Sequence, residues 1–267
     1  MGFWRDKIVL VTGGSSGIGR IIADAFAVAG ARLAIVGLEP EAVAQAEAEI
    51  RQSGRECLGI SANLTEQADV DRAIAQAVEH FGRLDVLVNN AGRTARGKVL
   101  DTTPEQFQEL MELNFVALVR CTRAALPHLL ASRGHVVNMG SLAAKSASRW
   151  VGAYPATKHA VAAYSQQLRL ELGSEGLHVL LVCPGPIERK DARLYPLEGL
   201  EDLPERARRP GAGVKTKAIP PERLAAAILR ACERREPELV MPGRARLLFA
   251  VSQLWPRWGD WLVLKNT

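Results

Sequence analysis

The chain has 267 residues, 48% hydrophobic and 24% charged, an ordinary composition for one large α/β domain with a substantial core. The net charge of +5 is mildly basic, but only 5% of residues are aromatic, which argues against nucleic-acid binding. The four cysteines form no CxxC pair, so we expect no metal site, no disulfide framework, reduced thiols and a cytoplasmic protein.

Short apolar runs alternate with helical patterns along the chain. Strands are predicted at 7–11, 32–36, 56–60, 84–88, 135–139, 178–182 and 238–241, and helices at 18–29, 40–53, 66–81, 105–131, 154–173 and 220–234. Apolar strands separated by helices predict a Rossmann-like, doubly wound parallel sheet of about seven strands with helices on both faces. We expect one dinucleotide-binding domain over 1–242 with a lid at 185–219, followed by an apolar and basic tail at 243–267.

Neither end of the chain predicts a membrane span. The N-terminal residues run directly into a strand-like stretch, so no signal peptide is expected. No uninterrupted apolar run approaches the ~20 residues needed to cross a bilayer.

The stretch "TGGSSGIG" (residues 12–19) follows the first predicted strand and opens the first helix. Its spaced glycines Gly13, Gly17 and Gly19 allow a sharp turn and a close approach of the backbone to a pyrophosphate. The following helix N-terminus offers unpaired N–H groups and the positive end of a dipole. In this strand–turn–helix context, the stretch predicts a dinucleotide cradle.

A second motif, "YPATK", places Tyr154 four residues before Lys158 on a predicted helix. Positions i and i+4 share one face of a helix, and a nearby ammonium favours the phenolate and lowers the pKa of the phenol. Such a pair would supply an acid–base group that operates near neutral pH, but tyrosine and lysine are also common at this spacing by chance, so the pair alone does not establish a function.

Together, "TGGSSGIG", "NNAG" (89–92), a serine upstream of the tyrosine and "YPATK" resemble the short-chain dehydrogenases/reductases in their compact single-domain form. The resemblance covers Lys7 to about Pro242. It implies a nicotinamide dinucleotide, hydride transfer between a carbonyl and an alcohol, and a catalytic tetrad. The tetrad positions are Asn114, Ser141, Tyr154 and Lys158. Ser141 follows Asn114 by 27 residues and Tyr154 follows Ser141 by 13, and both spacings fit the family.

The resemblance also implies roles within the site. Tyr154 donates or accepts the proton, Ser141 hydrogen-bonds the carbonyl oxygen, Lys158 also holds the nicotinamide ribose, and Asn114 binds a water that links Lys158 to solvent. Asn89 is expected to brace the sheet. The implied cofactor contacts are Gly13, Ser15, Ser16, Gly17, Ile18, Gly19, Gly37, Leu38, Asn63, Leu64, Asn90, Ala91, Gly92, Tyr154, Lys158, Pro184, Gly185 and Ile187.

The residues that would select NAD or NADP depart from the family pattern. Gly37 stands where NAD-preferring relatives carry an acid, and Leu38 and Ser16 stand where NADP-preferring relatives carry a basic residue. The absent acid leaves room for a 2′-phosphate that Arg20 would reach, whereas Glu39 argues for NAD. We expect NADP or NAD, with NADP slightly favoured.

Two further positions differ. Asn63 replaces the aspartate that meets the adenine amino group, although its side-chain carbonyl can accept the same hydrogen bond. After "PGPI" (184–187), Glu188 replaces a threonine that contacts the nicotinamide amide, so main-chain groups at 184–187 are expected to act alone.

Substrate contacts are expected from 93–98, 142–150 and 186–215. A basic rim there would suit an anionic substrate, or its charges simply face water; its members are Arg93, Arg96, Lys98, Lys145, Arg149, Arg189, Lys190 and Arg193. Trp150, Leu142 and Ala143 are candidates for an apolar wall of the substrate site or for ordinary packing.

Partner contacts are expected at two places. The long helices 105–131 and 154–173 imply a homodimer or homotetramer by resemblance. The tail at 244–264, interrupted by Pro256 and Gly259, packs on protein or lies on an acidic membrane surface, and the protein contact is favoured.

Three functions follow from these observations. The leading one is an NAD(P)-dependent oxidoreductase acting on a ketone, aldehyde or alcohol. The alternatives are a non-catalytic dinucleotide-binding regulatory protein and a membrane-peripheral reductase of a lipid-like ketone.

Overall fold

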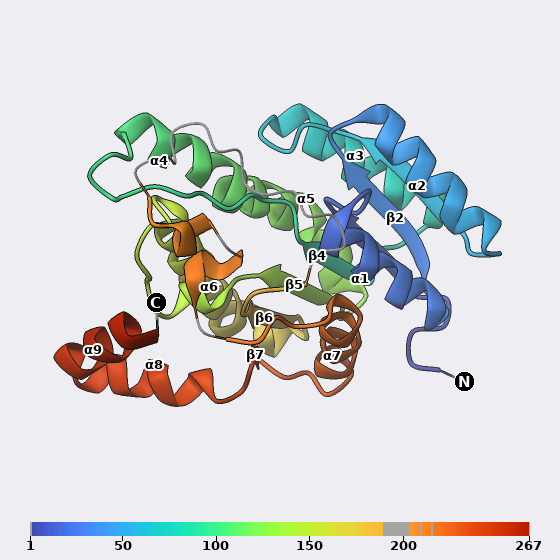
Figure 1. The fold of residues 1–267 in the computed structure, drawn as a ribbon. Coiled ribbons are helices and arrows are strands. Elements are labelled where there is room, and N and C mark those ends of the chain that lie inside the picture. Colours follow the sequence, from blue (N-terminus) through green and yellow to red (C-terminus); the bar gives the residue numbers. More distant parts are fainter. Residues whose placement is uncertain (1, 189–202, 209, 215, 267) are drawn as a thin grey trace.

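In the computed structural model, which describes residues 2–188, 203–208, 210–214 and 216–266, seven parallel strands form one sheet (Figure 1). The strands are β1 (Ile8–Thr12), β2 (Arg32–Gly37), β3 (Cys57–Ser61), β4 (Val86–Asn89), β5 (His135–Met139), β6 (His178–Pro184) and β7 (Glu238–Met241), in the order β3-β2-β1-β4-β5-β6-β7. The chain winds outward in opposite directions from β1 and β4, so the switch point where such sheets bind ligands lies at the carboxyl ends of these two strands. The predicted doubly wound sheet is confirmed.

Helices cover both faces of the sheet because its strands are apolar on both sides. On β1, Val9 and Val11 belong to a core with α1 (Gly17–Val28), α2 (Pro40–Gln52) and α7 (Pro221–Glu233). Ile8 and Leu10 belong to the opposite core, with α3 (Gln67–Phe81), α5 (Ala117–Ala131) and α6 (Tyr154–Leu172). This alternation has the two-residue period of a strand and fixes which face each helix covers.

The predicted helix at 105–131 consists of three pieces. After α4 (Pro104–Met111) comes a π-helical turn at Glu112–Val116, and α5 follows. Thr103 and Gln106 form a capping box at the start of α4. A π turn adds residues to one turn of helix without changing the apolar composition, so the sequence period does not reveal it.

The tail forms two helices, α8 (Ala245–Leu254) and α9 (Pro256–Asn266). Pro256 separates them and begins α9, which fits its fixed φ. The predicted interruption at Gly259 is wrong, because Gly259 lies inside α9. A Cβ there would lie 2.5 Å from Ser252 Cα, so the glycine permits α8 and α9 to pack closely.

Much of the predicted lid, 189–202, lies outside the described residues. Its two ends meet in an isolated bridge between Ile187 and Ile219. The four cysteines are buried and unpaired. Among the described residues, no helix has both the length and the apolarity required to cross a membrane.

Candidate active site

The sheet and its helices bring the four predicted catalytic residues to the carboxyl ends of β4 and β5. Tyr154 is the first residue of α6, and Lys158 lies one turn further along it. Ser141 follows β5 and caps a short 3-10 turn, where its Oγ accepts a hydrogen bond from the Ala143 N–H (3.1 Å). Asn114 lies in the π turn, a local geometry that is frequent at functional sites.

Lys158 carries a deeply buried ammonium group. Its side chain is 6% exposed, and Nζ donates a hydrogen bond to the Met139 carbonyl at 2.7 Å. Burial penalises the charged form and lowers the pKa of Lys158 from 10.5 to about 8. Nζ lies 5.7 Å from the centroid of the Tyr154 ring. Below about pH 8, an ammonium group therefore lies beside the phenol. The described contacts use one of its three N–H donors, and two can bind other partners.

A hydrogen-bond network joins Asn114 to the first turn of α6. Its Nδ2 donates to Thr157 Oγ1 (3.1 Å) and to the Arg93 carbonyl (2.9 Å), and its Oδ1 accepts from the Arg93 N–H (2.9 Å). Thr157 in turn donates to the Tyr154 carbonyl at 2.8 Å. Sequence reasoning missed Thr157, although it lies inside "YPATK", because its partner Asn114 is 43 residues distant.

The predicted cradle has the backbone geometry that its glycines allow. Gly13 and Gly17 have φ of 62° and 54°, the left-handed region that glycine adopts without strain. A Cβ on Gly19 would lie 2.1 Å from the Gly13 carbonyl oxygen, so only glycine fits there. Helix α1 begins at Gly17, just after Ser15 and Ser16, and has no acidic residue in its first turn. This arrangement suits an anion at the helix N-terminus.

Thr12, which sequence reasoning also missed, ties the cradle to "NNAG". Its Oγ1 accepts hydrogen bonds from the N–H groups of Asn90 (2.9 Å) and Ala91 (3.0 Å). The Asn90 side chain donates to the carbonyls of Thr12 (3.0 Å) and Gly13 (3.3 Å). The end of β1 and the end of β4 are thereby fixed to each other across the switch point.

Two other members of this region have structural partners. Asn89 braces the sheet as predicted, because its Nδ2 donates to Thr122 Oγ1 (3.0 Å) and to Asn138 Oδ1 (2.9 Å). At Gly92, a Cβ would lie 2.8 Å from Asn114 Oδ1. The glycine therefore allows the loop after β4 to pass directly beside the π turn.

At the predicted adenosine end of the site, steric space accounts for the glycine at position 37. A Cβ there would lie 2.6 Å from both Ser15 Oγ and Val43 Cγ2, so an acid at this position would displace its neighbours. Leu38 is exposed beside it. Arg20 does not reach this loop, because its guanidinium group pairs with Asp24 and Glu49, each at 2.9 Å.

Asn63 forms a local turn. Its Oδ1 accepts hydrogen bonds from the Thr65 N–H (3.1 Å) and from Thr65 Oγ1 (2.8 Å), which use both lone pairs. Neighbouring Leu64 is buried. The Asn63 side chain therefore has its amide N–H groups, rather than its carbonyl, to offer a further partner.

The segment after β6 is held by main-chain hydrogen bonds. The Gly185 N–H donates to the Met241 carbonyl (2.7 Å), and the Glu188 N–H donates to the Ile219 carbonyl (2.9 Å). Pro184 ends β6, and Ile187 lies in the bridge to Ile219. The main chain of 184–188 is thus fixed independently of the side chain at Glu188.

Three of the five rim residues that the structure describes form ion pairs within the protein. Arg93 pairs with Glu109 (2.6 Å), Lys98 with Asp101 (3.9 Å) and Lys145 with Glu238 (2.7 Å). These ion pairs favour the interpretation that the rim charges have structural or solvent-facing roles. Arg189, Lys190 and Arg193 lie outside the described residues.

Two remaining basic residues connect the rim to the described part of the lid. Arg96 Nε donates to the Ala207 carbonyl at 3.1 Å, and Arg149 lies over the Trp150 ring at 4.4 Å. Trp150 also packs against Leu203 and Ala207. This apolar contact with the described part of the predicted lid is compatible with a wall of the substrate site and with ordinary packing.

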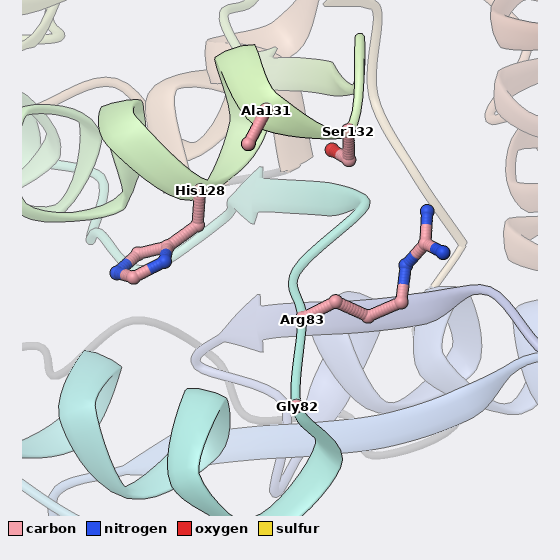
Figure 2. A pocket seen from close by; sticks show the side chains of 5 residues that line it. All are labelled: Gly82, Arg83, His128, Ala131 and Ser132. Carbon is pink, nitrogen blue, oxygen red and sulfur yellow. The ribbon is translucent and has the colours of Figure 1, made fainter.

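A surface pocket of about 250 Å³ lies elsewhere, between the end of α3 and the end of α5 (Figure 2). It is lined by Gly82, Arg83, His128, Ala131 and Ser132. Arg83 pairs with Asp85 through two contacts, of 2.5 and 3.0 Å. This pocket is at the amino ends of β4 and β5, opposite the tetrad, and it contains none of the predicted site residues.

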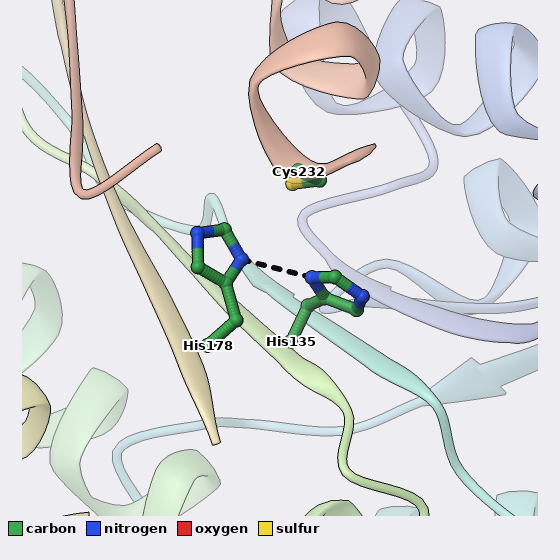
Figure 3. Close-up of side chains that lie close together, drawn as sticks. All are labelled: His135, His178 and Cys232. Carbon is green, nitrogen blue, oxygen red and sulfur yellow. Dashed lines mark hydrogen bonds between the residues drawn. The ribbon is translucent and has the colours of Figure 1, made fainter. Parts of the chain in front are cut away.

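A buried group of possible metal ligands, the one found among the described residues, consists of His135, His178 and Cys232 (Figure 3). The two histidine Nδ1 atoms are 2.8 Å apart, and His178 Nε2 is 2.8 Å from the Glu236 carbonyl. Because a carbonyl only accepts, His178 Nε2 carries the proton and His135 Nδ1–H donates to His178 Nδ1. Burial lowers the pKa of His135 to about 3 and that of His178 to about 4. We interpret the group as a neutral hydrogen bond within the core.

The family model described as "short chain dehydrogenase" matches residues 7–193. This match covers more than half of the chain, and the chain belongs to the short-chain dehydrogenase/reductase family of oxidoreductases.

Three known proteins illustrate the relationship. An uncharacterized oxidoreductase, YxnA, of Bacillus subtilis is 30% identical over 268 residues, which cover 98% of this chain and 72% of the relative. The 2-(R)-hydroxypropyl-CoM dehydrogenase of Xanthobacter autotrophicus is 37% identical over 187 residues, 68% of this chain and 75% of the relative. A short-chain dehydrogenase structure from Streptomyces avermitilis is 32% identical, has a TM-score of 0.79 and covers 96% of this chain and 94% of its own.

Proposed function

We propose that this protein is an NAD(P)-dependent oxidoreductase that interconverts a ketone or aldehyde and an alcohol by hydride transfer. The observation that carries the proposal is the buried ammonium of Lys158 beside the Tyr154 ring, at the same carboxyl edge of the sheet as the glycine cradle. Among the described residues this cation has a hydrogen bond to the Met139 carbonyl but no anionic partner; a buried charge of this kind is costly to fold and is expected where it serves a reaction.

The cradle residues fit a dinucleotide. A Cβ at Gly19 would fill the turn, and the start of α1 presents N–H groups without a competing acid. A bound nicotinamide ring would supply or accept the hydride. The residues proposed to hold it include Lys158, whose two remaining N–H donors suit the ribose hydroxyls, and the fixed main chain of 184–187.

The tetrad would handle the proton and the developing charge. In the reducing direction the carbonyl carbon gains a hydride, and Tyr154 Oη donates its proton to the carbonyl oxygen, which gives the alcohol. Ser141 Oγ accepts the Ala143 N–H with a lone pair, and its hydroxyl hydrogen can donate to the same carbonyl oxygen. Lys158 lowers the pKa of the phenol, since its positive charge favours the phenolate.

The Tyr154 proton must then be replaced from solvent. Both N–H groups of the Asn114 amide are used, and its Oδ1 has one lone pair left. A water relay to Lys158 would therefore use this lone pair or the Asn114 main-chain carbonyl. The network through Thr157 is proposed to hold Asn114 in place for this purpose.

The cofactor is proposed to be NADP or NAD. Two features of the sequence favour NADP: the absence of an acid at Gly37 and the presence of Arg20, which could bind the 2′-phosphate. The ion pairs of Arg20 with Asp24 and Glu49 argue against this role for Arg20. Glu39 precedes α2 and favours NAD. Comparing the two cofactors by titration is therefore the decisive measurement for this choice.

A secondary alcohol or its ketone is the proposed substrate class. The relative from Xanthobacter is named for a 2-(R)-hydroxypropyl compound, which contains such an alcohol. Trp150, beneath Leu203 and Ala207, offers an apolar wall beside the site. The protein is further proposed to form a homodimer or homotetramer through α5 and α6, which light scattering would detect.

The experiment is a Tyr154→Phe variant assayed with a panel of ketones and aldehydes that includes long-chain examples, using NADH and NADPH. Loss of the proton donor should lower kcat by about 10²- to 10⁴-fold while cofactor affinity stays nearly constant. Tyr164→Phe, the same chemical change further along α6, serves as the control. Cofactor binding without any turnover by the wild type would instead favour the regulatory alternative.

A further inference from the structure

The helical hairpin formed by α8 and α9 carries an unusual share of exposed apolar side chains. Six of the twelve large hydrophobic side chains exposed in the described parts of the chain lie on or between these two helices, so they form a local feature rather than scattered exposure. They are Leu247, Leu254, Trp255, Trp258, Trp261 and Leu264. Figure 1 shows the hairpin at the margin of the molecule, beyond the edge strand β7.

The spacing of these residues gives each helix an outward apolar stripe. On α8, Leu247 and Leu254 are seven residues apart, which is two turns. On α9, Trp258, Trp261 and Leu264 follow at intervals of three, and the Trp258 and Trp261 rings lie edge to face with centroids 6.3 Å apart. Three tryptophans, counting Trp255, therefore project from one small unit.

The opposite side of the hairpin is anchored to the domain. Ala245 and Phe249 of α8 are buried in a core cluster that includes Val240 of β7. The Arg246 guanidinium group donates to the Glu238 carbonyl at 3.0 Å, and Gly259 allows close packing on Ser252. The exposed stripe thus belongs to an ordered amphipathic element that is built to keep its apolar side outward.

Charge distinguishes between the occupants that would cover this stripe. Apart from Arg246, whose guanidinium group anchors the hairpin to Glu238, the exposed basic residues of 244–265 are Arg244, Arg257 and Lys265, and the acidic residue is Asp260. In a symmetric contact with a second copy, the same patch faces itself, so a surplus of two positive charges would meet an equal surplus. An acidic lipid surface complements these charges and also accepts tryptophan side chains at the headgroup level.

We propose that the α8–α9 hairpin docks flat on an anionic lipid surface. The tryptophans insert at the boundary between headgroups and acyl chains, and Arg244, Arg257 and Lys265 bind the headgroup charges. This inference goes beyond the proposed reaction and does not depend on it. It requires no membrane span, since the hairpin lies in the plane of the interface.

The test is co-sedimentation of the full chain with lipid vesicles at low salt. One set of vesicles contains equal parts of phosphatidylglycerol and phosphatidylcholine, and the other contains phosphatidylcholine alone. The variants are Trp258→Ala with Trp261→Ala, and Arg257→Glu. Arg234→Glu is the matched control, because it changes the net charge equally from an exposed side chain (73%) on another part of the surface. Tryptophan emission reports insertion independently.

We expect binding to the anionic vesicles with a blue shift of tryptophan emission, and weak binding to phosphatidylcholine alone. The double tryptophan variant should abolish the blue shift and most of the binding. Arg257→Glu should lower the partition coefficient about 25-fold, since each unit of charge near an acidic surface contributes about fivefold. Arg234→Glu should leave it nearly unchanged.

Three results would overturn the proposal. The first is no binding to anionic vesicles. The second is equal weakening by Arg257→Glu and Arg234→Glu, which would mean unspecific attraction of the whole protein. The third is a change of oligomeric state, rather than of lipid binding, in the double tryptophan variant, which would assign the stripe to a second copy of the chain.

Discussion

Replacing Lys158 with methionine should stabilise the protein while removing its activity. Methionine has a similar length and no charge, so Lys158→Met removes an ammonium group that is 6% exposed and keeps most of its packing. Stabilisation by loss of a proposed catalytic group is the opposite of what a structural lysine would show. It follows if the charge is retained for function at a cost in stability.

The magnitude follows from the pKa. A drop from 10.5 to about 8 corresponds to about 3 kcal/mol by which burial disfavours the charged lysine at pH 7. Methionine avoids this cost but leaves the Met139 carbonyl without its donor, which costs about 1–3 kcal/mol. The net gain at pH 7 is therefore about 1 kcal/mol, within a range from about zero to about 2 kcal/mol, or a few degrees in Tm.

The pH dependence is the sharper signature. The pKa of Lys158 is lower in the folded chain than in the unfolded one, so the wild type gains stability as pH rises from about 8 to 10.5. At pH 9.5, about 2 kcal/mol of the cost has gone, and the advantage of Lys158→Met should shrink by that amount.

Urea unfolding at pH 7 and pH 9.5 measures both effects, with Lys145→Met, at a lysine paired with Glu238 near the surface, as the control. Two results together would contradict the proposed cost of burying the Lys158 charge. The variant would be less stable than the wild type by more than about 1 kcal/mol at pH 7, and the difference in free energy of unfolding between the two proteins would be the same at pH 9.5.

Two other outcomes follow from buried hydrogen bonds. Thr157→Val removes the hydroxyl partner of the Asn114 amide, so kcat should fall while the affinity for cofactor changes little. Thr157→Ser keeps the hydroxyl and should retain the wild-type kcat. A wild-type kcat in the valine variant would show that the network has no positioning role. His135 and His178 have pKa values lowered to about 3 and 4, so the unfolded chain takes up their protons first. Stability should therefore fall below about pH 6.5, by up to about 2.7 kcal/mol per pH unit, and this slope should flatten in a variant with both histidines replaced by glutamine. Equal slopes in acid denaturation of the two proteins would contradict the assignment.

The sheet and most helices could be predicted from the sequence because their signals are local. Runs such as "KIVLV" have the apolar character of buried parallel strands, and "TGGSSGIG" places its glycines where the backbone must turn. The structure confirms the element order and brings the predicted site residues to one edge of the sheet. What the residues do there remains a prediction.

Long-range partners could not be predicted. Thr157 contacts Asn114, 43 residues away, and Thr12 contacts Asn90, 78 residues away. No pattern in either segment indicates which residue is the partner. The same applies to Arg20, whose pairing with Glu49 directs it away from the predicted cofactor loop. The partners of such side chains are determined by the tertiary structure rather than by the neighbouring residues in the sequence.

Two local features were also invisible for a physical reason. The π turn around Asn114 changes the hydrogen-bond register of a helix without changing its apolar pattern. Gly259 resembles a helix breaker, yet it serves the close packing of α9 on Ser252. A glycine in sequence does not distinguish a flexible backbone from a close approach.

The most direct test of the account is a titration of the purified protein with NADH and NADPH, followed by nicotinamide fluorescence and repeated with Gly19→Ala. We expect saturable binding of at least one cofactor by the wild type. We expect this binding to be lost in Gly19→Ala, because a Cβ there would lie 2.1 Å from the Gly13 carbonyl oxygen. Urea unfolding of the variant verifies that it is folded. No binding of either cofactor by the wild type, or unchanged binding by a folded Gly19→Ala variant, would contradict the assignment of the cradle.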